Sequence, residues 1–452
     1  MTNDMTSGNP IKLILAFTIP VCLGNVFQQF YNLADSVIAG QFLGVNALAA
    51  IGATGSLVFL VVGWLNGITS GFAILISQCF GAKKYDQMRH YIAMSIYLCV
   101  FFVVIMTVGL EMANLPILHM MNAPEELIGD ISGYMAVIYA GLAATAAYNA
   151  LSAILRALGD SKTPLYFLMF SSVINIILDI VCITQFQMGV VGCGYATVIA
   201  QGISAVLCFI YIWKKFEILH LKKEDFHFSW NSAVKMLSLG VPMGLQFSIT
   251  AIGTIIVQGA VNVYGPTYIA GFSAGSKIQN IVGTVFGSFG VTAATYVGQN
   301  LGAGKIERVK KGVRQIEGMV VIWGLVMMAV ISLFGAQMVH LFIDSGESGV
   351  ADVAIQYFKV VAWCYPFLGS IFVYRNALQG MGYGLIPMMG GVFELAARAL
   401  VVWLVAAQGS FAAVCFSDPA AWIAALIPLV PYYIIKMRKM TSQYEIGRSE
   451  TI

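Results

Sequence analysis

Long apolar stretches dominate the chain, and short polar segments separate them. A helix that spans a bilayer needs about 20 predominantly apolar residues, and twelve stretches of the sequence reach this length. They lie near residues 13–35, 46–78, 91–112, 131–152, 164–185, 190–213, 233–262, 267–299, 315–337, 352–373, 386–407 and 411–435. The pattern predicts an all-α polytopic membrane protein with twelve transmembrane helices.

The second half of the chain repeats the first. Residues 76–84 (ISQCFGAKK) resemble residues 296–305 (YVGQNLGAGK), with Gln78 matched to Gln299 at an offset of 221. Pro20 matches Pro242 at an offset of 222. Each half holds six predicted helices, an even number, so both halves enter the membrane from the same side. We therefore expect two pseudo-symmetric six-helix bundles, with the substrate site between them.

Basic residues fix the predicted orientation and the domain boundaries. Those used for this assignment follow the even-numbered spans: Lys83, Lys84, Arg89, Arg156, Lys162, Lys214, Lys215, Lys222, Lys223, Lys305, Arg308, Lys310, Lys311, Arg314, Arg375, Lys436, Arg438 and Lys439. By the positive-inside rule both termini are cytoplasmic, in a multi-pass protein of the cell membrane. The expected units are an N-lobe at 1–213, a cytoplasmic linker at 214–232, a C-lobe at 233–436 and a cytoplasmic tail at 437–452.

Composition supports this class and argues against others. Only 10% of residues are charged and 59% are hydrophobic, whereas soluble domains carry about 25% charge. The eight cysteines include no CxxC pair and are interpreted as small buried hydrophobes. The sequence has no P-loop, HExxH or nucleophile elbow. We therefore expect no enzyme activity, no cofactor and no nucleic-acid partner.

Two predicted helices carry acids among apolar residues. Asp35 follows Asn32 by three positions on the first span, and Asn175 and Asp179 are four apart on one face of the fifth. Thr197 lies on the sixth span. Intramembrane acids usually mark ion or proton pathways. Oxygen ligands suit hard cations such as Na⁺, and a buried carboxyl group can also carry a proton.

The second half does not repeat these acids. At the repeat offsets Asp35 corresponds to Ile256, and Asn175 corresponds to Arg398. Ion coupling is therefore expected in the first half. Two alternatives remain open: Asp35 could lie among the lipid headgroups, and Asn175 and Asp179 could simply bond neighbouring helices.

Other polar positions suggest supporting roles. Glu394 and Arg398 are four apart and predict a structural ion pair, and Pro20 predicts a helix bend. Lys277 and Asp418 receive no assigned role. The candidates for a substrate cavity are Gln28, Tyr31, Asn32, Gln246, Gln258, Asn262, Gln279 and Asn280.

These motifs, in this order and doubled, resemble the MATE (multidrug and toxic compound extrusion) family over nearly the whole chain. The resemblance rests on Pro20 and on residues 32–35 (NLAD), 78–82 (QCFGA), 156–160 (RALGD), 175–179 (NIILD), 298–303 (GQNLGA) and 379–382 (QGMG). Asp35, Asn175, Asp179 and Thr197 match the N-lobe cation site of the DinF-like branch. The chain is also similar to the MepA-type subgroup. The C-lobe acid of the NorM-like branch is not evident, since the seventh span has Gln246 and Gln258.

The resemblance implies a secondary antiporter of the MATE fold that exports lipophilic, often cationic drugs or toxic metabolites in exchange for H⁺ or Na⁺. It implies membrane lipids as partners and a monomeric state. One alternative is a flippase of lipid-linked sugars from the same superfamily, which would require an arginine-rich cavity to hold a pyrophosphate. A membrane-embedded enzyme is a more remote alternative, because no catalytic constellation is present.

Overall fold

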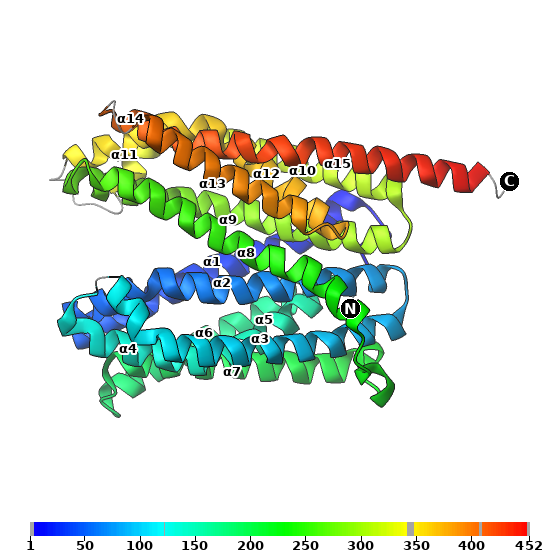
Figure 1. The fold of residues 1–452 in the computed structure, drawn as a ribbon, viewed down its shortest axis with the longest axis horizontal. Helices are drawn as coiled ribbons and strands as arrows, with labels where there is room; N and C mark the ends of the chain where they lie inside the picture. Colours follow the sequence, from blue (N-terminus) through cyan, green and yellow to red (C-terminus); the bar gives the residue numbers. More distant parts are fainter. Residues whose placement is uncertain (1–3, 122, 341–347, 406–408, 450–452) are drawn as a thin grey trace. The chain divides into compact units, whose positions relative to one another are not determined.

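The computed structural model describes residues 4–121, 123–340, 348–405 and 409–449. Every regular element in these residues is a helix (Figure 1). Within this part of the chain, 11 helices are long and apolar enough to cross a membrane, and one bent pair brings the number to 12. The predicted all-α fold with twelve spans is confirmed.

The first half contains α1 (Pro10–Leu43), α2 (Val45–Gly81), α3 (Tyr85–Met120), α4 (Glu125–Ala140), α5 (Leu142–Ala157), α6 (Lys162–Thr184) and α7 (Gly189–Lys215). The linker forms two short 3₁₀ helices, η1 (Glu217–Leu219) and η2 (Lys223–Phe226). The second half contains α8 (Trp230–Asn262), α9 (Pro266–Gly302), α10 (Ile306–His340), α11 (Ser348–Val361), η3 (Ala362–Cys364), α12 (Tyr365–Gly380), α13 (Leu385–Val405), α14 (Phe411–Cys415) and α15 (Ser417–Ser449).

The internal repeat is visible in the turns between helices. Gly44, between α1 and α2, has φ 90°, and Gly265, between α8 and α9, has φ 93°. Gly159 and Gly382, which end the matching helices α5 and α12, have φ 84° and 93°. Glycine adopts this left-handed backbone without the steric cost that a Cβ brings. The two halves therefore reverse direction by the same local geometry.

The fourth span of each half is broken. In the first half α4 and α5 meet at an angle of 48° next to Gly141. In the second half the 3₁₀ segment η3 separates α11 from α12. Because the break recurs at the corresponding place, it belongs to the repeated scaffold.

The chain forms two compact units whose boundaries lie within helices. Unit 1 contains Asp4 and residues 19–244, and unit 2 contains residues 5–18 together with the described residues after 244. The first turns of α1 thus belong to unit 2, and the first half of α8 belongs to unit 1. These boundaries differ from the predicted lobes at 1–213 and 233–436, and the linker at 214–232 lies inside unit 1.

Hydrogen bonds explain why the start of the chain belongs to unit 2. The backbone N–H of Met5 donates to Gln299 Oε1 at 3.0 Å, and the Met5 carbonyl accepts from Asn300 Nδ2 at 3.1 Å. Lys305 Nζ donates to the Thr6 carbonyl at 2.8 Å. At the other end of this segment the hydroxyl groups of Thr18 and Thr292 are 2.7 Å apart. The amino-terminal segment is therefore fixed to α9 and to the turn that follows it.

Glycines explain why the start of α8 belongs to unit 1. A methyl group added at Gly71 of α2 would lie 2.5 Å from Gly240 Cα of α8. One added at Gly67 would lie 2.6 Å from Gly244 Cα. Small residues spaced four apart let helix backbones approach closely in membranes. The backbones of α2 and α8 are therefore in direct contact where the two helices cross.

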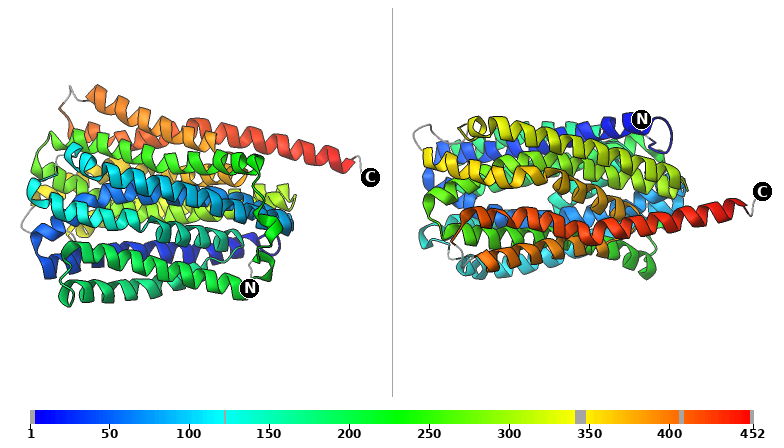
Figure 2. Two further views of the ribbon diagram at one scale, coloured as in Figure 1. Left: turned by 60° about the horizontal axis from the view of Figure 1, so that its bottom comes forward. Right: turned by 90° about the horizontal axis from the view of Figure 1, so that it is seen from above.

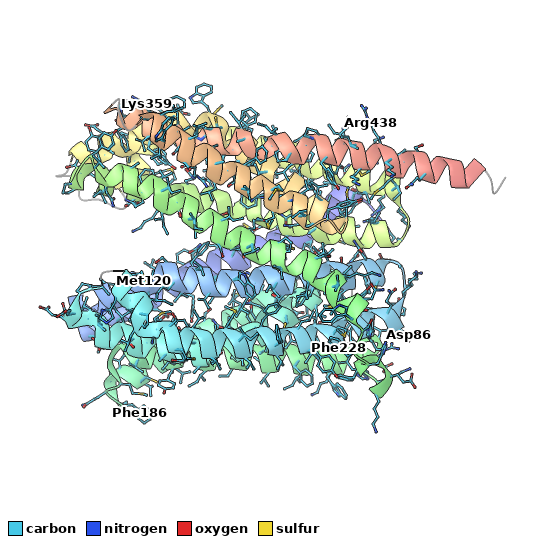
Figure 3. The ribbon with its side chains drawn as sticks, viewed as in Figure 1. Asp86, Met120, Phe186, Phe228, Lys359 and Arg438 are labelled. Atoms are coloured by element: carbon cyan, nitrogen blue, oxygen red, sulfur yellow. The ribbon has the colours of Figure 1, made fainter. Side chains whose placement is uncertain are left out.

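Within unit 1 the helices run between two distinct ends. Figure 3 shows Asp86 and Phe228 at one end, and Met120 and Phe186 at the other. The linker and the turn carrying Lys83 and Lys84 share the first of these ends. Within unit 2, α13 and α15 lie side by side, and the last turns of α15 extend past the other helices of that unit (Figures 1 and 2).

The contact between α2 and α8 gives a direct test. We expect Gly71→Ala to lower the thermal unfolding midpoint, because overpacking costs about 1–3 kcal/mol and the added methyl group meets backbone rather than a flexible side chain. Gly52→Ala in the same helix is the matched control, since nothing lies within 4 Å of its added methyl group. Equal midpoints for the two purified variants would contradict the proposed close packing.

Candidate ion and substrate site

Polar side chains from three helices of unit 1 gather around two acids. Helix α1 supplies Tyr31 and Asp35, α4 supplies Tyr134, and α6 supplies Asn175 and Asp179. The carboxyl groups of Asp35 and Asp179 lie close enough to interact electrostatically, and both tyrosines are within reach of them. The structure therefore brings together the acids that the sequence placed on the first and fifth spans.

These acids are buried without compensation. Asn175 and Asp179 are fully buried, and Asp35 is partly buried. Both oxygens of Asp179, Oδ1 of Asp35 and both amide atoms of Asn175 lack a hydrogen-bond partner. Among the described residues, no lysine, arginine or histidine forms an ion pair with either acid. Because buried charge is stable only when it is paired, this cluster is suited to binding a cation or a proton.

Thr197 joins the cluster through Tyr31. The Tyr31 hydroxyl donates to Thr197 Oγ1 at 3.1 Å, which connects α1 to α7 beside Asp35. Because Thr197 Oγ1 is the acceptor of this bond, its own O–H group is not used by the contact with Tyr31. All four predicted coupling residues therefore lie in unit 1, with Thr197 linked to the acids indirectly.

A small polar cavity of about 40 Å³ adjoins the cluster in unit 1. Among the residues that line it are Gln28, Tyr31, Tyr148, Asn149, Ser171 and Gln201. A buried water molecule needs about 10–15 Å³, so the cavity can hold a few waters or a small ion. It is too small for a drug-sized molecule in this conformation.

The predicted substrate residues are divided between the two units. Gln28 and Tyr31 line the small cavity, while Asn32 on α1 is exposed. The others lie in unit 2, where the exposed Asn280 is on α9. Three separate contacts account for the rest: Gln379 Nε2 donates to Gln246 Oε1 at 3.1 Å, Gln258 Nε2 donates to Asn262 Oδ1 at 2.8 Å, and Tyr357 contacts Gln279.

Unit 2 contains two buried acids, Glu394 and Asp418, that each have a basic partner. A third acid, Glu317 on α10, accepts a hydrogen bond from the Ser370 hydroxyl, and its Oε2 has no hydrogen-bond partner. Arg398 Nη1 lies 3.7 Å from Glu394 Oε2, and Arg398 Nη2 lies 3.2 Å from Asp418 Oδ1. Arg375 pairs with the other oxygen of Glu394. None of the four residues exceeds 8% exposure. Two arginines and two acids thus form a buried network without net charge.

The network extends the predicted pair of Glu394 and Arg398 and corrects one assignment. Arg375 was expected in a loop after the tenth span, but it is buried within α12 and bonded to Glu394. Asp418, which received no role from the sequence, accepts a hydrogen bond from the Tyr357 hydroxyl at 2.9 Å. In the sequence, only the closeness of Arg375 to the apolar span 352–373 indicated that it could lie within a helix. Lys277, by contrast, is exposed on α9.

The fold and the unpaired acids together define an integral membrane transporter built from two related halves. The MatE family model matches residues 20–181 and 242–404, one match in each half. The chain belongs to this family, and the resemblance to it that the sequence motifs indicated is confirmed.

Known proteins support the assignment. The chain is 31% identical to the probable multidrug resistance protein YpnP of Bacillus subtilis, with 84% of each chain covered. It is 21% identical to the multidrug export protein MepA of Staphylococcus saprophyticus, with 96% of each covered. Its fold matches a crystal structure of MATE in the bent conformation with a TM-score of 0.90, at 20% identity and 98% coverage of both chains.

The charge network predicts a specific stability defect. Arg398→Met leaves Asp418 without its cation, and breaking a buried pair in this way costs about 3–5 kcal/mol. We expect a clearly lower thermal unfolding midpoint, and partial recovery in the double variant Arg398→Met/Asp418→Asn. Lys277→Met removes an exposed cation and serves as the control. A midpoint for Arg398→Met equal to that of the control would contradict the structural role.

Proposed function

We propose that the chain is a secondary active antiporter that exports lipophilic and cationic small molecules in exchange for H⁺ or Na⁺. Family membership and the names of the two curated relatives support export of drugs or toxic metabolites. The observation that carries the coupling proposal is the pair of buried acids in unit 1 that have no basic partner. No catalytic role or cofactor enters this proposal.

The proposed cycle follows from competition for one negative charge. With Asp35 and Asp179 ionised, the site attracts an organic cation from the cytoplasm. Binding of H⁺ or Na⁺ from outside neutralises the acids and weakens the attraction for the drug. Because a ligand shifts an equilibrium only by its differential affinity for the two states, the ion and the drug must favour different conformations.

Helix α1 is the proposed moving part. Pro20 is buried within this helix and cannot donate a hydrogen bond, so the helix can bend there. The segment before Pro20 is fixed in unit 2, and the segment after it carries Asp35 in unit 1. A change of charge at Asp35 would therefore act on the part of α1 after Pro20, while the part before Pro20 stays bonded to unit 2.

The proposed orientation places both termini in the cytoplasm. In unit 1, Lys83, Lys84 and the linker lysines share the end of the helices that carries Asp86 and Phe228 (Figure 3). Basic residues accumulate on the cytoplasmic side of membrane proteins. We further propose that the protein acts as a monomer within the cell membrane.

A flippase of lipid-linked sugars is a weaker candidate. Such a protein needs arginines free to hold a pyrophosphate. Arg375 and Arg398 are instead bonded to Glu394 and Asp418. The charges of these two arginines are therefore already neutralised within the protein.

Removing either acid should abolish coupling. We expect Asp35→Asn and Asp179→Asn each to reduce ion-driven drug efflux by at least about tenfold, which corresponds to about 1.4 kcal/mol. The measurement is drug uptake into proteoliposomes under a pH gradient or a sodium gradient, imposed separately. Asp130→Asn, which removes an exposed acid of α4, is the control. Undiminished efflux by both site variants would overturn the proposal.

A second variant separates the two coupling ions. Sodium needs several oxygen ligands, whereas a proton needs only a carboxyl group. Asn175→Leu should therefore abolish drug uptake driven by sodium and leave uptake driven by a pH gradient within about twofold. Loss of both activities in a protein with a normal unfolding midpoint would show that Asn175 does not act as a sodium ligand alone.

A further inference from the structure

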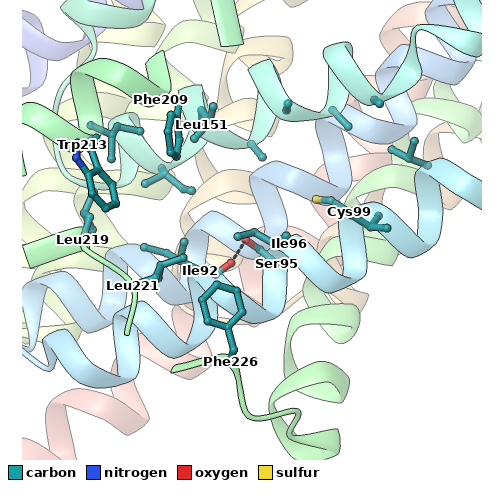
Figure 4. Close-up of a pocket in the computed structure, with 18 of the residues that line it drawn as sticks. Ile92, Ser95, Ile96, Cys99, Leu151, Phe209, Trp213, Leu219, Leu221 and Phe226 are labelled. Carbon is teal, nitrogen blue, oxygen red and sulfur yellow. Dashed lines mark hydrogen bonds between the residues drawn. The ribbon is translucent and has the colours of Figure 1, made fainter. Parts of the chain in front are cut away.

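Unit 1 contains a second and much larger cavity of about 750 Å³. It is a groove between α3, α5 and α7 (Figure 4). Small side chains of α5, among them Ala143, Ala147 and Ala150, make room for it. This volume lies within the range of about 300–1,000 Å³ typical of ligand sites. The groove takes no part in the proposed transport cycle.

The walls of the groove are suited to a hydrocarbon chain. Val100, Val104 and Phe209, on its open side, are each more than half exposed. The hydroxyl of Ser95 donates to the Ile92 carbonyl at 2.6 Å (Figure 4), so this polar group is already satisfied within the helix. In a transmembrane helix such an apolar and open surface faces acyl chains. An occupant of the groove must therefore be largely apolar.

The linker closes one end of the groove. Leu219, Leu221 and Phe226 line this end, as Figure 4 shows. The rings of Trp213 and His220 stack with their centroids 4.4 Å apart, and His220 Nε2 lies 2.7 Å from the Trp213 carbonyl. The position of Phe226 is fixed by the Tyr97 hydroxyl, which donates to its carbonyl at 3.0 Å. The groove thus ends at an ordered wall.

Positive charge accumulates at this end. Lys214 and Lys215 follow Trp213 directly, and Lys222 and Lys223 follow Leu221; all four are exposed. Within the described residues none of these lysines forms an ion pair. Two exposed acids, Glu217 and Glu224, oppose them.

Two acids share Arg89 at this end. Its Nε lies 3.2 Å from Oδ2 of the buried Asp225, and it also pairs with the exposed Asp86. The four lysines and Arg89 exceed the acids Glu217, Glu224, Asp86 and Asp225 by one charge, so the mouth of the groove is cationic. An apolar groove that ends in a cationic mouth, with a tryptophan at the boundary, matches the amphipathic structure of a lipid.

We propose that the groove binds one anionic glycerophospholipid of the leaflet at the linker end. An acyl chain lies along α3, α5 and α7, the glycerol region reaches Trp213, and the phosphate is held by Lys214, Lys215 and Lys222. The bound lipid bridges the linker and the ends of α3 and α7. It would therefore stabilise the linker that joins the two halves of the chain.

Native mass spectrometry of delipidated protein tests this assignment. Phosphatidylglycerol and phosphatidylcholine with identical acyl chains are titrated separately. We expect the wild-type protein to bind one phosphatidylglycerol at least about tenfold more tightly than phosphatidylcholine. The variant Lys214→Gln/Lys215→Gln/Lys222→Gln should lose this preference. Ala147→Phe, which fills the exposed floor of the groove, should weaken binding of both lipids.

Controls distinguish the groove from general charge and from misfolding. Lys310→Gln/Lys311→Gln/Lys439→Gln removes three exposed lysines of unit 2 and should keep the preference. Unfolding midpoints identify any variant that fails to fold, and the lysine and Ala147 variants test the site independently.

Five results would overturn the assignment, the first four of them in lipid binding. These are equal affinity of the wild type for both lipids, an unchanged preference in the variant lacking Lys214, Lys215 and Lys222, unchanged binding in Ala147→Phe, and an exported drug that displaces the lipid one for one. A dimer peak that Ala147→Phe removes would assign the groove to a second copy of the chain and would also overturn it.

Discussion

A carboxylate among apolar helices is stable only when a cation, a proton or several hydrogen-bond donors compensate its charge. The two units of this protein meet that constraint differently. Unit 2 supplies two arginines to two acids and closes the network internally. Unit 1 leaves Asp35 and Asp179 beside each other with unpaired oxygens. In the proposed function a bound cation or proton supplies the compensation that unit 1 lacks, and the rest of that proposal depends on this difference.

The difference is imposed on a shared scaffold. The turns at Gly44 and Gly265, and at Gly159 and Gly382, have the same left-handed backbone, and the family model matches each half once. At corresponding positions of this scaffold the first half has the neutral amide of Asn175, and the second half has the cation of Arg398. The acids differ as well, since Asp35 corresponds to Ile256 and Asp179 corresponds to Val402. The two halves therefore carry different polar residues on one scaffold.

How far the sequence predicted these features depends on the range of the interactions involved. Apolar length located all twelve spans, and spacing along single helices placed Asn175 with Asp179 and Glu394 with Arg398, because those relations are local. Arg375 and Asp418 were misplaced or left unassigned because their partners come from distant helices. The groove at the linker escaped prediction for the same reason. The division of α1 and α8 between the two units could not be predicted from the sequence either. It depends on long-range contacts, namely the backbone hydrogen bonds of Met5 and the contact between Gly71 and Gly240.

The small size of the polar cavity constrains the order of events. A space of about 40 Å³ lined in part by Tyr31 can admit an ion or water but no drug, so ion and drug cannot occupy this cavity of unit 1 equally well. This is the condition for exchange, since two ligands that favour the same state cannot drive each other out. Widening the cavity requires motion of a helix that lines it. Among these helices α1 is distinctive, because it carries both Tyr31 and Asp35 and also contains the buried Pro20. The segment before Pro20 is bonded to unit 2 through Thr18 and Met5. The charge of the acids and the volume available to the drug are therefore set by the same helix.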